Sequence, residues 1–158
     1  MTRTYQYDAD TFEDVERIIA GELVQIEAKF KNADYTSQMR GFLDQLNAAH
    51  AVRFDRDVSP AGEKWPPLSK VTIANKGHDT ILEDTRAMKR SVTESGAPNA
   101  IRSATHRGLV FGTSDEKAIF HQYGTRKIPQ RKFVGMETAL LDHFVASIAD
   151  ATVEKMLT

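Results

Sequence analysis

Cysteine is absent from the 158 residues, tryptophan occurs once, and five residues are proline. Without cysteine the chain can form neither a disulfide nor a thiolate metal site, and it carries no thiol nucleophile. No run of about 18 apolar residues occurs, so we expect no membrane-spanning helix. Residues 1–8 contain no apolar segment of the kind found in a secretory signal. Together these absences indicate a protein that folds in a reducing cytoplasm and has no membrane partner.

Sequence motifs typical of enzymes are also missing. There is no glycine loop that would cradle a phosphate and no Gly-x-Ser-x-Gly nucleophile elbow. None of the histidines lies three or four residues from another, so no helix presents a pair of imidazole ligands. We therefore expect no catalytic residue, no cofactor and no metal, and a protein that is not an enzyme. The histidines are His50, His78, His106, His121 and His143.

A pair of carboxylates leaves one enzymatic alternative open. Asp55 and Asp57 are two residues apart, as in some magnesium-dependent nucleases. A metal-dependent hydrolase built on these two residues is therefore a distant third hypothesis. The same residues directly follow the end of a predicted helix and precede a proline loop, where acidic residues are common. We favour that structural explanation.

Charge is distributed unevenly along the chain, although the net charge is only −1. Residues 86–132 contain ten Lys/Arg and three Asp/Glu, whereas residues 1–50 contain five Lys/Arg and nine Asp/Glu. Regions of opposite sign can steer contact with nucleic acid or with another copy of the chain. The basic region from Arg86 to Lys132 supports a second hypothesis, a small DNA-binding or nuclease-like accessory protein. A solvated surface that is merely polarised explains the pattern equally well.

Apolar periodicity predicts three longer helices. The first covers residues 10–31, with Asp10 or Thr11 as its N-cap. The second covers residues 36–54 and follows a short linker, which is typical of two helices packed as an antiparallel hairpin. The last covers residues 137–156. Short helical segments are expected at Leu68–Lys76, Ile81–Lys89 and Lys117–Tyr123.

The periodicity changes between the short helices and the last one. Ser91–Ser95, Ala100–Thr105 and Gly108–Thr113 are short runs separated by turn-forming residues, which predicts an antiparallel meander of three strands. The predicted fold is therefore α+β, with a small antiparallel β-sheet flanked by α-helices. Residues 1–56 would form an N-terminal helical hairpin and residues 57–158 an α+β body that ends in a C-terminal helix. Together they make one domain over residues 1–158.

The segment at residues 57–67 is a predicted loop, because three of the five prolines lie in it. It also contains Trp65, the only tryptophan. A single tryptophan in a proline-rich loop usually pins that loop to the core through its large apolar area. We favour this role for Trp65, and an anchor in a protein–protein interface is the alternative.

Three motifs follow one another from residue 59 onward, and their order is informative. The motifs are Ser59-Pro60-x-Gly62-x-x-Trp65-x-Pro67-Leu68, Ala118-Ile119-Phe120-His121-Gln122-Tyr123-Gly124 and Ile128-Pro129-x-Arg131-x-Phe133-Val134-Gly135. They resemble motifs of the phage virion morphogenesis family, which includes the tail completion proteins of Mu-like and related tailed phages. The resemblance extends from about Asp57 to the C-terminus. Lys132 stands where the family usually has proline, and Ile119 and Phe120 replace smaller residues, which bears on the subfamily.

The resemblance implies a structural part of a phage or prophage particle. Members of the family act as ring-forming components at the head–tail junction or the tail end, and none of their motif residues is catalytic. The chain would then form a homo-oligomer, expected to be a hexameric ring, in a virion assembled in the bacterial host cytoplasm. Expected partners are tail terminator, neck or connector proteins, with non-specific contact to DNA in the lumen of the ring.

The third motif also suggests where the copies would meet. Ile128-Pro129 forces an extended backbone, and arginine beside aromatic residues is typical of interfaces. We therefore expect Lys127–Gly135 to be an assembly contact with apolar anchors at Phe133 and Val134. Positive φ angles are expected at Gly124 and Gly135. The candidate interface residues are Trp65, His121, Tyr123, Arg126, Lys127, Ile128, Pro129, Arg131 and Phe133.

Overall fold

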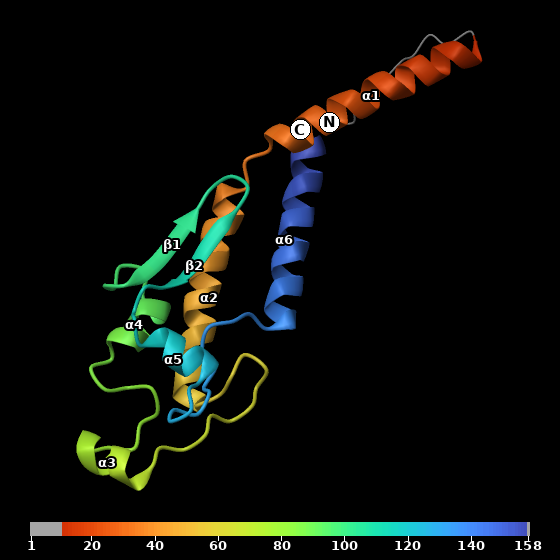
Figure 1. Ribbon diagram of the computed structural model, residues 1–158. Coiled ribbons are helices and arrows are strands. Elements are labelled where there is room, and N and C mark those ends of the chain that lie inside the picture. The colour runs from red at the N-terminus through yellow and green to blue at the C-terminus, as the bar shows by residue number, and fades with distance from the viewer. Residues whose placement is uncertain (1–10, 158) are drawn as a thin grey trace.

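The computed structural model describes residues 11–157, apart from the side chains of Phe12 and Val15. Within them the fold is α+β, as predicted, with helices packed against one face of a two-stranded antiparallel sheet (Figure 1). The N-cap of the first helix is Thr11, whose Oγ1 accepts a hydrogen bond from the backbone N of Asp14 at 3.1 Å; the alternative cap Asp10 lies outside the described residues. The elements in order are α1 (Phe12–Asn32), α2 (Thr36–Arg56), α3 (Lys70–Lys76), α4 (Ala87–Thr93), β1 (Ala100–Ala104), β2 (Leu109–Thr113), α5 (Ala118–Tyr123) and α6 (Thr138–Leu157).

The sheet contains two strands instead of the predicted three. β1 and β2 pair with Ala100 opposite Thr113 and Ala104 opposite Leu109. The expected third strand at residues 91–95 is wrong, because residues 91–93 belong to helix α4. Met88 and Val92 are four residues apart and both buried, so helical spacing directs both side chains into the core.

The segment before α4 is also different from its prediction. Residues 81–86 do not form a helix, and α4 begins at Ala87. Leu82 and Arg86 have φ angles of 57° and 61°, which interrupts any right-handed helix. The irregular backbone nevertheless buries Ile81 and Leu82 in the main core. The apolar pair that suggested a helix is thus explained by burial alone.

The core has two parts, both built on α2. The lower part in Figure 1 packs segments that follow α2 in the sequence around the C-terminal end of this helix. The upper part packs α2 against α6, where the rings of Phe42 and Phe144 stack with their centroids 4.1 Å apart. The buried residues of the lower core are Phe54, Trp65, Ile81, Leu82, Met88, Val92, Ala118 and Phe133.

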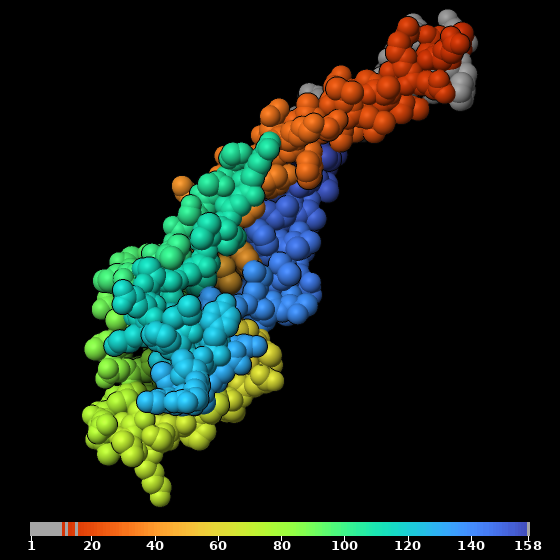
Figure 2. All heavy atoms as spheres, in the orientation of Figure 1, coloured from red at the N-terminus to blue at the C-terminus, as the bar shows by residue number. Residues whose placement is uncertain are grey.

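Helix α1 does not pack back along α2, so the predicted antiparallel hairpin is wrong. α1 instead contacts the end of α6 and projects away from the body (Figures 1 and 2). The linker sets this direction, because Tyr35 is buried and its hydroxyl lies 2.8 Å from Thr152 Oγ1 on α6. The backbone N of Tyr35 also donates to His106 O in the β1–β2 turn at 3.2 Å. These two contacts fix the linker at Tyr35, so α1, which precedes it, extends away from the rest of the protein.

No helix in residues 11–157 has both the length and the apolar composition needed to cross a membrane.

Candidate assembly surface

The Trp65 loop is fixed to the core, as predicted. Trp65 is 5% exposed, and its ring meets Phe54 edge-on with centroids 5.3 Å apart. Its Nε1 donates a hydrogen bond of 2.8 Å to the carbonyl oxygen of Lys132. The only tryptophan therefore joins the first motif to the third.

Gln122 fastens the second motif to the third. Its Oε1 accepts hydrogen bonds from the backbone N of Phe133 and of Val134, both at 3.1 Å. Its Nε2 donates to the carbonyl oxygen of Val134 at 2.9 Å. The side-chain amide of Gln122 thus forms the hydrogen bonds that a neighbouring strand would form, since residues 133–134 are not part of the sheet. The sequence contained Gln122 in a motif but gave no sign of this role.

Arg131 completes the junction between the motifs. The side chain is buried, and its Nε and Nη2 donate to the carbonyl oxygens of Pro66 and Pro67 at 2.7 and 2.9 Å. A guanidinium presents several donors in a rigid plane, which suits two adjacent carbonyl groups. Arg131 therefore holds the proline loop in place, and its guanidinium is occupied by these bonds within the protomer.

Arg53, on α2, also binds the segment that contains the third motif. Its Nη1 donates to Phe133 O at 2.7 Å and Gly135 O at 3.3 Å, and its Nη2 donates to Glu137 Oε1 at 2.9 Å. The sequence interpretation missed this residue. A signal was present, since His50 lies four residues after Leu46 and Arg53 three residues after His50, so both continue the apolar stripe of α2. A polar residue at a core position usually has a buried partner.

The two glycines of the motifs have different reasons to be glycine. Gly124 ends α5 with φ 73°, and a Cβ there would lie 3.0 Å from the backbone N of Gln130, so the expected positive φ is confirmed. Gly135 does not have a positive φ, and that prediction is wrong. A Cβ at Gly135 would instead lie 2.6 Å from Pro60 Cγ, because the first and third motifs touch there.

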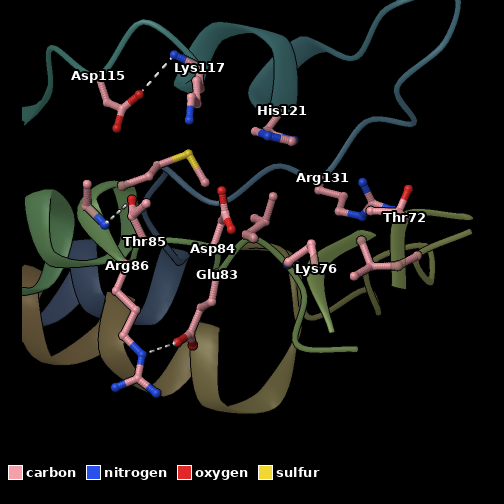
Figure 3. A pocket seen from close by; sticks show the side chains of 14 residues that line it. Thr72, Lys76, Glu83, Asp84, Thr85, Arg86, Asp115, Lys117, His121 and Arg131 are labelled. Carbon is pink, nitrogen blue, oxygen red and sulfur yellow. Dashed lines mark hydrogen bonds and ion pairs between the residues drawn. The ribbon is translucent and has the colours of Figure 1, made fainter. Parts of the chain in front are cut away.

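A pocket of about 200 Å³ lies between α3, α5 and the segment before α4. Figure 3 shows Lys117 and His121 from α5 facing Asp84 and Thr85 across it. Burial, and then the nearby Arg131, lower the pKa of His121, so the ring is neutral at neutral pH. His121 Nδ1 has no hydrogen-bond partner, whereas a catalytic histidine is usually oriented by a carboxylate. Among residues 11–157, no hydrogen bond therefore orients the His121 ring through Nδ1.

The carboxylates considered for a metal site have structural positions. Asp57 is the C-cap of α2 with φ 52°, and its carbonyl oxygen accepts from Trp65 N at 2.8 Å. Asp55 Oδ1 accepts a hydrogen bond from Lys89 Nζ at 3.2 Å. Within residues 11–157, no group of three or more His, Asp or Glu side chains is arranged to hold a metal ion.

The basic region is partly used inside the molecule. Arg86 pairs with Glu83, Arg90 with Glu94, and Lys89 with Asp55 and Glu83. Arg102 lies over the Phe111 ring at 3.8 Å and donates to Asn47 and to three backbone carbonyl groups. Internal partners of this kind reduce the charge that the region offers to a DNA backbone. The exposed basic residues without such partners in the structure are Arg107, Lys117, Arg126, Lys127 and Lys132.

The nine candidate interface residues divide into two groups. Trp65, Arg131 and Phe133 are buried inside the protomer, with exposed fractions of 5%, 5% and 0%. The expectation that Phe133 anchors a contact between copies, with Arg131 beside it, is therefore wrong, because both side chains are buried within the protomer. An interface role for the other six stays a prediction. They comprise the exposed Tyr123, Arg126, Lys127 and Pro129 and the half-buried His121 and Ile128.

An apolar patch is exposed on α5, and of its residues only Tyr123 belongs to the predicted interface set. Ile119, Phe120 and Tyr123 are 59%, 50% and 73% exposed. Ile101 and Val110 are exposed on the outer face of the adjacent β-hairpin. Residues 117–132, which include α5, carry five Lys/Arg and no Asp/Glu. We call these five apolar residues and their basic surroundings the α5 face.

The buried His50 makes stability depend on pH. Its exposed fraction is 0%, and its Nδ1 donates to Leu46 O at 2.6 Å while Nε2 has no partner. Burial lowers the pKa of His50 to about 4, from an ordinary 6.5. As the pH falls from 6.5 towards 4, the unfolded chain binds a proton that the folded chain does not, so stability is lost over that window.

We expect the free energy of unfolding to fall by about 2 kcal/mol between pH 7 and pH 5, measured by urea titration. His121 adds in the same direction, because its pKa is lowered too. In the variant His50→Leu most of this pH dependence should disappear. An equal slope in the variant and the parent protein would contradict the assignment.

Comparison with known proteins gives one match. The family model described as the phage virion morphogenesis family matches residues 12–150. No curated protein and no solved structure matches the chain.

Proposed function

Because this chain belongs to the phage virion morphogenesis family, we propose that it forms a ring with copies of itself at the head–tail junction or at the tail end of a phage or prophage particle. The family match over residues 12–150 is the observation that carries the proposal. The match supports a structural role in building the virion. That the chain forms a ring, and that the ring lies at the junction or the tail end, are our more specific proposals.

The use of the motif residues supports a structural role. Trp65, Gln122 and Arg131 bind backbone groups of one another's segments. In an enzyme, the side chains shared by a family would instead converge on a space for substrate. Here they fix the loops that surround the α5 face. The distinctive residues of the family therefore shape a surface.

The proposed partners are other copies of the chain and the tail terminator, neck or connector proteins that border such a ring. Exposed basic residues, among them Arg126 and Lys127, would allow contact with DNA in the lumen without reading its sequence. The site of action is then the virion, after assembly in the bacterial host.

We expect the purified protein to form closed rings, with sixfold symmetry to match a phage tail. A closed ring repeats one heterologous interface, so mass by light scattering and negative-stain electron microscopy should agree on a single copy number. A protein that stays monomeric, both at high concentration and beside purified heads and tails, would contradict the proposal. A monomer with strongly salt-dependent DNA binding would favour the DNA-binding alternative instead.

Deleting the gene from the phage or prophage that encodes it tests the position in the particle. The lysate should contain heads and tails that are not joined or tails that are not completed, visible by electron microscopy. The protein supplied from a plasmid should restore complete particles. Normal particles in the deletion lysate would overturn the proposed role.

A further inference from the structure

Helix α1 exposes a row of apolar side chains to solvent. Ile19, Leu23, Ile26 and Phe30 recur at spacings of four, three and four residues and are 54%, 60%, 43% and 55% exposed. Such spacing places them on one face of the helix. Helix α1 contacts α6 near its C-terminal end, where Lys29 Nζ donates to Met156 O at 3.3 Å. We call α1 with this row the arm.

An apolar row of this length is costly in water. An isolated helix is marginally stable on its own, and most helical stability in proteins comes from packing an apolar face. Contiguous exposed apolar residues on a soluble protein usually mark a contact surface. The arm is therefore shaped to be covered by something else.

Three surfaces of another copy could cover the arm, and charge separates them. The arm contains five Asp/Glu and three Lys/Arg, and two of the basic residues, Lys29 and Lys31, lie in its last turn. A second arm would bring the same excess of negative charge. Helix α6 also exposes apolar side chains, such as Val145 at 57%, but it contains three Asp/Glu and one Lys. Like charges oppose both of these pairings.

The α5 face has the opposite charge and a matching apolar surface. Lys117, Arg126 and Lys127 are exposed around it, and residues 117–132 contain no acidic residue. Ile119 and Tyr123 are four residues apart, so they lie on one side of α5. They line a shallow groove between the end of β2 and α5, which has apolar residues such as Ala118 and Val134 on one part and the acidic Asp115 and Glu116 on another. Residues 115–132 still carry five Lys/Arg against these two acidic residues. A helix with an apolar row and acidic flanks fits this surface.

We propose that the arm of one copy docks on the α5 face of the next copy. The proposal rests on the proposed function, because it supplies the repeated interface of the ring. The arm leaves the body at the end remote from α5 (Figure 1), and its 21 residues span about 31 Å. It therefore points away from its own α5 face and meets that of another copy. Donor and acceptor are different surfaces, so the contact is head-to-tail, which is the kind of interface that a closed ring repeats.

Two single variants test the two sides of this contact. Leu23→Lys places a positive charge in the row of the arm, and Ile119→Glu places a negative charge on the α5 face. Both side chains are largely exposed, at 60% and 59%, and both replacements are good helix formers, so the fold should be unchanged by circular dichroism. Each variant alone should lose the ring, with the apparent dissociation constant raised at least about tenfold. Val145→Lys, on the rival face of α6, is the matched control and should assemble like the parent protein.

Mixing the variants gives the decisive measurement. Leu23→Lys retains an intact α5 face and Ile119→Glu retains an intact arm, so an equimolar mixture should form dimers or larger assemblies, as measured by light scattering at high concentration. The introduced lysine and glutamate have opposite charges, so the second contact in the mixture is weaker than the intact one but not repulsive. A mixture that stays monomeric would overturn the proposal, and so would rings that persist in either single variant. Loss of rings in Val145→Lys alone would identify α6 as the acceptor instead. If the parent protein itself forms no ring, the proposed function has failed, and not merely this contact.

Discussion

Replacing Trp65 with alanine should lower the free energy of unfolding by about 3–5 kcal/mol. The side chain is 5% exposed and contacts Phe54 in the lower core, so its removal leaves a cavity that the surrounding loop must fill. The Lys132 carbonyl also loses the hydrogen bond from Nε1. Urea unfolding followed by circular dichroism measures the effect, because the variant has no tryptophan fluorescence.

Trp65→Phe separates the two contributions. Phenylalanine retains much of the apolar area and removes the hydrogen bond of 2.8 Å to Lys132 O. The hydrogen bond itself is worth about 0.5–1.5 kcal/mol, so this variant should be clearly less destabilised than the alanine variant. If Trp65→Ala unfolds at the same urea concentration as the parent protein and loses only assembly, then Trp65 is an interface anchor and its role in the core is wrong.

The second large effect is expected at Arg53. Changing Arg53 to methionine should cost about 3 kcal/mol, because buried hydrogen bonds from a charged group are strong and their acceptors would be left without a donor. Arg53 is 1% exposed and reaches Phe133 O, Gly135 O and Glu137. Methionine fills a similar volume, so the loss reports mainly on these bonds. Equilibrium unfolding in urea at constant pH measures it.

Two further variants show whether the backbone contacts of Arg53 matter most. Glu137→Gln removes only the ion pair, and since the Glu137 side chain is 42% exposed, solvent screens it and the cost should be below about 1 kcal/mol. Arg40→Met changes an exposed arginine of the same helix and should be nearly neutral. Equal losses in Arg53→Met and Arg40→Met would mean that Arg53 does not hold the junction.

The sequence predicted those features that depend on local periodicity. Helices α1, α2 and α6 were found close to their observed bounds, since apolar spacing and capping residues act within a few residues of each other. The role of Trp65 followed from its size and from the proline loop around it. The order of the three motifs indicated the phage virion morphogenesis family, and the family model that matches residues 12–150 confirms it.

The errors concern contacts between distant parts of the chain. Ser91–Ser95 has the composition of a strand, but burial of Met88 and Val92 favours a helix there. The short linker suggested a hairpin, whereas the contact of Tyr35 with Thr152 directs α1 elsewhere. Arg131 and Phe133 looked like contact residues because an arginine near an aromatic ring is equally common in interfaces and in buried junctions. Only the fold shows which of the two applies.

The long reach of Arg53 has a consequence for how the protein is made. Its hydrogen bonds to residues 133 and 135 join parts of the chain that are 80 and 82 positions apart. Contacts of such separation form late, because a long loop must close before they contribute. While the ribosome is still adding the third motif, the arm and α2 have already emerged but the lower core lacks Phe133. The α5 face is therefore completed only near the end of synthesis. A growing chain thus exposes its own arm before it has the surface on which the arm of a neighbouring copy would dock.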